Sequence, residues 1–160
     1  MSASDQLERF LDFSSEMTGF SVFDLEGTGQ AQPFLDAVTG VVGEELVDEL
    51  LDAYVGVDDQ VRSKERETML RRAILSDEKL GPIARNVIKL WYVGIWYELP
   101  AEWTDAFGAH ENDRMFTVSP AAYTEALLWP AIGANPPGAK GPGYGNWALP
   151  PKLAPEGPLR

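Results

Sequence analysis

The residues of this chain that could do chemistry are few. Its 160 residues include no cysteine, which excludes disulfides, thiolate nucleophiles and cysteine-ligated metal sites. The single histidine, His110, lies in the charged string AHENDR with no serine beside it, so we expect an exposed loop histidine. Carboxylates such as Glu44 and Asp48 stand on adjacent turns of one predicted helix, whereas a glycosidase needs two carboxylates opposed across a cleft. The sequence therefore predicts no catalytic, metal-binding or cofactor-binding residue in this chain.

One fragment, GTGQAQ at residues 27–32, suggests a dinucleotide-binding site. It carries two glycines of a dinucleotide-binding fingerprint, but Gln32 stands in place of the third. No alternation of strands and helices follows it, and such a site needs a parallel sheet. We therefore interpret this fragment as a loop that leads into a helix.

Charge is distributed unevenly along the chain, whose net charge is −12. Residues 1–60 hold fourteen Asp or Glu and one basic residue, Arg9, whereas residues 61–160 hold eleven acids and twelve bases. An acidic surface repels phosphate and anionic lipid, so nucleic acid and membrane surfaces are not expected partners. No run of about 18 apolar residues is present, so we expect no segment that spans a membrane.

Apolar residues recur at helical spacing over most of the first 129 residues, separated by residues that start or stop helices. Ser4 and Ser119 are predicted N-caps, Pro33 is expected in a first turn, and Pro130 is expected to end the last helix. We expect a loop over residues 21–32 and find no convincing strand pair. The predicted helices span residues 5–18, 33–42, 44–55, 58–75, 83–99 and 120–129.

The string LWYVGIWY, residues 90–97, is the most apolar part of the predicted helix over residues 83–99. At helical spacing its side chains point in widely different directions, so this helix needs cover on every side. A central place in a small bundle would supply that cover, but a small domain rarely encloses a helix completely. Four large aromatic side chains here would bury roughly 600–1000 Å², which is comparable to one partner's share of a standard interface, about 800 Å². We therefore expect part of this surface to contact another protein.

The chain ends in a segment rich in proline and glycine. Residues 130–160 contain eight prolines and six glycines, which disfavour helices and central strands. Disordered tails are usually poor in aromatic residues, whereas this one carries Tyr144 and Trp147. The expected fold is all-α: a small irregular helical domain over residues 1–129, followed by a long extended arm over residues 130–160 that wraps a partner. The residues expected to contact that partner are Trp91, Tyr92, Trp96, Tyr97, Trp129, Pro136, Pro137, Tyr144 and Trp147.

Two unusual strings resemble a known family. They are ARNVIKLWYVGIWYELP (84–100) and ENDRMFTVSPAAYTEALLWPAIGANPPGAKGPGYGNWA (111–148). Together they resemble the small subunit of membrane-associated, FAD-dependent sugar and alditol dehydrogenases, especially of the sorbitol dehydrogenase type. The similarity covers about residues 80–148 and continues more weakly at FLDFSSEMTGF and FLDAV.

The resemblance implies a non-catalytic accessory subunit. It would bind and stabilise a large flavoprotein of the glucose–methanol–choline type, which holds FAD and oxidises the sugar. In this family electrons often pass on to a multihaem cytochrome c subunit, and many small subunits carry a twin-arginine signal. Residues 1–10 contain neither twin arginine nor an apolar stretch, so the chain as written is expected in the cytoplasm. The alternative is a periplasmic location within an exported complex.

Two other functions stay open at this stage. The chain could be a stand-alone adaptor or scaffold that presents its proline-rich arm to an aromatic groove. It could also be a small helical enzyme that acts through His110 with Glu111 or Asp113.

Overall fold

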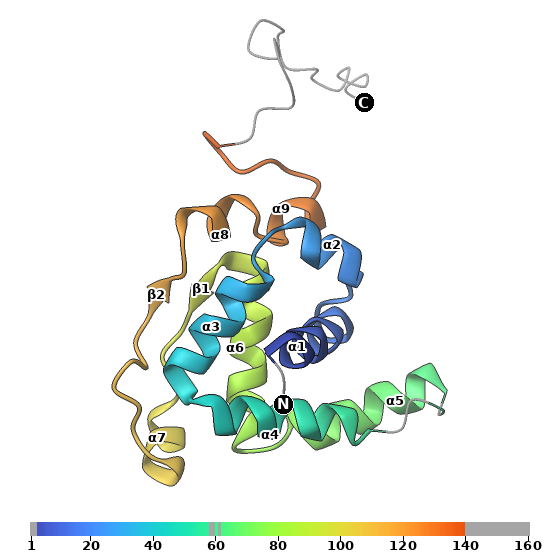
Figure 1. The fold of residues 1–160 in the computed structure, drawn as a ribbon, viewed down its shortest axis with the longest axis vertical. Helices are drawn as coiled ribbons and strands as arrows, with labels where there is room; N and C mark the ends of the chain where they lie inside the picture. Colours follow the sequence, from blue (N-terminus) through green and yellow to red (C-terminus); the bar gives the residue numbers. More distant parts are fainter. Residues whose placement is uncertain (1–2, 58–59, 61, 140–160) are drawn as a thin grey trace, which may run out of the picture.

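The computed structural model describes residues 3–57, 60 and 62–139, which form a predominantly helical fold (Figure 1). This architecture confirms the mainly helical class expected from the sequence. α1 begins at Ala3, so Ser4 lies within the first turn and does not cap the helix as predicted. Most of the packing involves four helices: α1 (Ala3–Thr18), α3 (Ala31–Val42), α4 (Glu44–Val55) and α6 (Leu80–Val93).

The hydrophobic core forms where α6 packs against α1, α3 and α4. Trp91 of α6 lies between two phenylalanines at its centre. Its ring centroid is 6.4 Å from that of Phe10 in a stacked arrangement and 5.0 Å from that of Phe34 in an edge arrangement. Such aromatic pairs stabilise the fold beyond the area that they bury. The helices expected at residues 33–42 and 44–55 are confirmed, with Gly43 between them.

The loop expected over residues 21–32 is wrong for its first half, which forms helix α2 (Val22–Gly27). A capping box starts this helix. The Ser21 hydroxyl accepts a hydrogen bond from the Asp24 N–H, and the Asp24 carboxylate accepts one from the Ser21 N–H, each at 3.2 Å. This pattern satisfies the first amide donors and allows a helix of only six residues. Pro33 lies in the first turn of α3, as predicted.

The helix expected over residues 58–75 is shorter among the described residues and changes type within its length. α5 (Ser63–Leu70) continues into the π-helical turn η1 (Arg71–Leu75), and the pair extends to one side of the fold (Figure 1). Arg66 ties α5 to α1, because its guanidinium donates to both carboxylate oxygens of Glu16 at 2.8 and 3.0 Å. A bidentate pair of this kind fixes geometry as well as charge.

The helix expected over residues 83–99 ends earlier than predicted, at Val93. Gly94 adopts the left-handed conformation with φ +72°, and its N–H donates to the Leu90 carbonyl at 2.8 Å. A Cβ at residue 94 would lie 2.8 Å from the backbone carbonyl of Ala122, so the close approach also requires glycine. LWYVGIWY is therefore not one helix that is apolar on every side.

Beyond Gly94 the chain forms a strand pair that the sequence did not predict. β1 (Ile95–Trp96) pairs antiparallel with β2 (Phe116–Thr117), with Trp96 opposite Phe116. The buried side chain of Asn86 donates to the Tyr97 carbonyl at 2.7 Å and holds β1 against α6. Between the strands lies the short helix α7 (Ala101–Phe107).

The last predicted helix is divided in two, α8 (Pro120–Thr124) and α9 (Leu128–Ala131). Ser119 caps α8 as predicted and accepts a hydrogen bond from the Ala122 N–H at 3.0 Å. Pro130 does not end a helix as expected. It lies in the first turn of α9, where a backbone N–H would have no acceptor within the helix, so the N–H that proline lacks is not needed. Residues 129 and 130, between which the boundary of the helical domain and the arm was expected, therefore both lie within α9.

Candidate functional site

Two of the expected partner contacts lie in the core of this chain. Trp91 is 1% exposed and Trp96 is 0% exposed. The Trp96 indole N–H donates to the Asp113 carboxylate at 2.9 Å, so the loop that carries Asp113 covers this ring. Their assignment as partner contacts is therefore corrected: the chain turns at Gly94, and its own helices and loops cover both indoles.

The two tyrosines of the same string are half-buried. The Tyr92 hydroxyl donates to the Thr18 carbonyl at 2.8 Å, and its ring packs edge-on against Phe20. Tyr97 lies beneath the Lys89 ammonium, 4.8 Å from the ring centroid. Each ring keeps an exposed edge but already has a partner within the chain.

Three of the remaining expected contacts, Trp129, Pro136 and Pro137, lie near the C-terminal end of the described residues. Trp129 is half-buried, and its indole N–H donates to the Tyr123 carbonyl at 2.8 Å. Pro136 is buried and Pro137 is exposed. Tyr144 and Trp147 lie outside the described residues.

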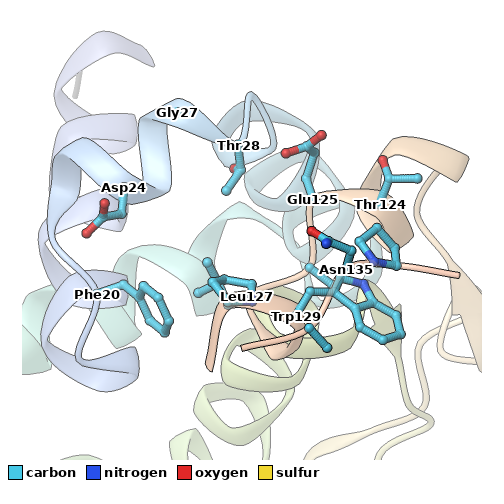
Figure 2. A pocket seen from close by; sticks show the side chains of 13 residues that line it. Phe20, Asp24, Gly27, Thr28, Thr124, Glu125, Leu127, Trp129 and Asn135 are labelled. Atoms are coloured by element: carbon cyan, nitrogen blue, oxygen red, sulfur yellow. The ribbon is translucent and has the colours of Figure 1, made fainter. Parts of the chain in front are cut away.

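Trp129 and Pro136 belong to the wall of a groove between α2 and the α8–α9 segment (Figure 2). The groove has a volume of about 400 Å³. Its lining residues include Phe20, Leu127, Ala134 and Asn135, and Figure 2 shows Leu127 between Phe20 and Trp129. This volume is within the range of sites that hold a small molecule or a buried side chain, roughly 300–1,000 Å³.

Large apolar side chains remain exposed beside this groove. Phe23, 82% exposed, lies on α2 between the lining residues Phe20 and Gly27, and Ile132, 61% exposed, follows α9. Tyr123 is 41% exposed and packs edge-on against Trp129. The sequence analysis missed Phe23 because it lies in the segment interpreted as a loop, and Ile132 because it stands alone between Ala131 and Gly133. The capping pattern at Ser21 was the signal that could have placed Phe23 on a helix.

The groove is acidic as well as apolar. Asp24 and Glu125 are among its lining residues, which include no lysine, arginine or histidine. Figure 2 shows Asp24 on α2 and Glu125 on the segment between α8 and α9. An occupant with an apolar side chain and a neighbouring positive charge therefore matches this surface best.

The residues first considered for catalysis have structural partners. His110 is half-buried, with its ring centroid 5.7 Å from that of Trp103. Asp113 accepts hydrogen bonds from the Trp96 indole and from the Leu99 N–H. Asp48 accepts a hydrogen bond from Gln6 at 2.8 Å. These contacts hold the fold together and bring no nucleophile to His110.

One ionisable cluster is strongly perturbed. The Tyr54 hydroxyl donates to Glu16 at 3.1 Å, and the Arg66 guanidinium lies 5.6 Å from the centre of the Tyr54 ring. Burial, followed by the negative charge of Glu16, raises the pKa of Tyr54 to about 12. Hydrogen bonding to Glu16 raises the pKa of Arg66 as well. The cluster joins α1, α4 and α5 and has a structural explanation.

Within residues 3–57, 60 and 62–139, no three acidic or histidine side chains come together as a metal site would require. None of the helices in these ranges has the length and apolar character of a membrane span. No protein-family model matches the chain, and neither a curated protein nor a solved structure does.

Proposed function

We propose that this chain is a non-catalytic accessory subunit that binds and stabilises a large, FAD-containing sugar or alcohol dehydrogenase of the glucose–methanol–choline type. The observation that carries the proposal is the apolar surface beside the groove, where Phe23, Tyr123 and Ile132 remain exposed. Exposed apolar residues that cluster beside a groove are typical of protein-binding surfaces. The resemblance of residues 84–100 and 111–148 to small subunits of such dehydrogenases supplies the class of partner.

The energetics require more contact than these three side chains provide. Complete burial of a large apolar side chain contributes about 1.5–3 kcal/mol, so three contribute at most about 5–9 kcal/mol. Association costs roughly 4–15 kcal/mol in lost translational and rotational freedom. The proposed interface therefore also includes Trp129 and, from the arm, Pro137, Tyr144 and Trp147.

In this proposal FAD belongs to the partner subunit, and this chain contacts protein. Tyr92 and Tyr97 remain proposed contacts through their exposed edges. A multihaem cytochrome c subunit is a further proposed member of the complex.

Co-expression with a large FAD-containing dehydrogenase, sought among the neighbouring genes, tests the proposal. We expect the two proteins to co-purify as a yellow complex that oxidises a sugar or polyol. Expressed without this chain, the flavoprotein is expected to be insoluble or to lose its flavin. A flavoprotein that is soluble, active and indifferent to this chain would contradict the proposed function.

A pair of matched variants locates the contact surface. The double variant F23S/I132S removes two exposed apolar side chains beside the groove, and V55S/M115S removes two of similar exposure elsewhere. We expect F23S/I132S to lower the amount of co-purified flavin at least about tenfold, which corresponds to 1.4 kcal/mol. V55S/M115S should leave it unchanged. Equal losses of co-purified flavin in the two double variants would show that the contact does not lie beside the groove.

A further inference from the structure

We propose that in the free chain the groove between α2 and α8–α9 holds the chain's own C-terminal segment, with Tyr144 or Trp147 seated against Leu127 and Trp129. The proposal concerns the isolated chain and does not depend on the proposed function. It rests on the direction of the chain at its last described residues, on the length that follows, and on the match in chemistry between groove and segment.

The described chain ends in a turn that reverses its direction. The Ala139 N–H donates to the Pro136 carbonyl at 3.2 Å, and Gly138 has φ +75°. Proline at the second position and glycine with positive φ at the third are typical of a type II turn. Before the turn, Ala134 to Pro136 form one wall of the groove and lead away from it (Figure 1). The turn therefore reverses the chain within three residues of the groove wall, at the point where the described residues end.

The length of chain that follows is sufficient to reach the groove. Tyr144 is five residues and Trp147 eight residues beyond Ala139. At about 3.3 Å per residue, these segments can span roughly 17 and 26 Å. The wall that must be reached begins only three residues before Ala139. A short tether of this kind also gives the segment an effective concentration in the millimolar range, so even weak docking is populated.

The chemistry of the segment complements that of the groove. The lining residues include the carboxylates Asp24 and Glu125 and no basic side chain. Residues 140–160 contain three basic residues and a single acid, Glu156. An aromatic ring buries about 150–250 Å², and a neighbouring lysine such as Lys140 would lie close to the acidic rim.

The proposal also separates two states of the chain. If the segment occupies the groove in the free chain, it must leave before it can contact another protein. The docked segment would then cover Leu127 and Trp129, which line the groove, until a partner binds. A second copy of the chain could offer the same segment, and the experiment distinguishes that case.

Spin labelling of the full chain tests the proposal directly, because the absence of cysteine makes one introduced cysteine unique. A nitroxide attached to the variant A148C should broaden the amide signals of Thr28 and Leu127 beyond detection. Amides of α7, on the opposite side of the fold (Figure 1), should keep their intensity. Unchanged signals at the groove would overturn the proposal.

Two controls establish that the signal loss comes from docking within one chain. A134W fills the groove and should restore the lost signals, whereas A131W places the same side chain on an exposed residue outside the groove and should not. Y144S/W147S should also restore them and changes no residue of the groove. In a mixture of spin-labelled and unlabelled chains, broadened groove signals in the unlabelled chains would show that the segment docks on a second copy. That result would overturn the proposal of docking within one chain.

Discussion

At the scale of single residues, Asp113 determines how the segment after α6 is held. Its carboxylate accepts hydrogen bonds from the Trp96 indole at 2.9 Å and from the Leu99 N–H at 3.0 Å. Hydrogen bonds to a charged group contribute about 1.5–3 kcal/mol each and leave buried donors unpaired when lost. We expect D113A to lower the free energy of unfolding by about 2–4 kcal/mol in urea denaturation. D105A, on an exposed turn of α7, is the control and should change it by less than about 0.5 kcal/mol.

Tyr54 makes the stability of the fold depend on pH in the alkaline range. Burial and the charge of Glu16 raise the pKa of Tyr54 from 10.0 to about 12, so the folded state holds the phenolic proton more tightly than the unfolded chain. The stabilisation is complete below pH 10 and is lost as the pH rises toward 12. We expect stability to fall more steeply over this range in the wild type than in Y54F, measured by urea denaturation at each pH. Identical slopes in the two proteins would contradict this assignment, because other tyrosines and lysines contribute equally to both.

At the scale of elements, Gly94 decides where α6 ends. Any other residue would have to adopt φ +72° and place a Cβ 2.8 Å from the Ala122 backbone. Gly19, which follows α1, has φ +78° and donates its N–H to the Ser15 carbonyl at 2.9 Å, but has no atom within 4 Å of the position of a Cβ. G19A should therefore cost only the backbone term, about 1–2 kcal/mol. G94A should cost clearly more in the same unfolding measurement, since the clash adds to that term; equal losses would show that the contact with Ala122 relaxes freely.

The contrast between these elements also explains what the sequence could predict. Periodicity and stop residues predicted α3, α4 and the cap of α8, because local apolar spacing and a single side chain determine each of them. The end of α6 depends on Ala122, almost thirty residues away, and no local pattern reveals that contact. The groove likewise joins Phe20 to Trp129, and only the fold brings them together. Expecting Trp91 to face a partner was wrong for the same reason: Phe10 and Phe34 already enclose it.

At the scale of the whole molecule, the uneven charge of the sequence becomes a pattern of contacts between its two parts. Residues 1–60 are strongly acidic, and two basic residues from the later part pair with them: Arg66 with Glu16, and Lys79 with Glu49. These pairs attach α5 and the start of α6 to α1 and α4. They neutralise only part of the acidic surface, so the folded state retains considerable repulsion between carboxylates.

Salt should therefore stabilise this protein. Raising sodium chloride from about 20 to about 200 mM shortens the Debye length to below roughly 10 Å and screens repulsion across the acidic surface. Exposed ion pairs contribute only about 0–1 kcal/mol each and weaken at the same time, so for a net charge of −12 the loss of repulsion should dominate. We expect the melting temperature, followed by circular dichroism, to rise by about 2–4 °C, which corresponds to about 1 kcal/mol for a chain of this size. E8Q/D12N removes two negative charges from exposed positions of α1 and should reduce the rise. A melting temperature that falls with salt would show instead that ion pairs such as Arg66 with Glu16 outweigh the repulsion, and would assign them a larger role in holding α5 than their exposure suggests.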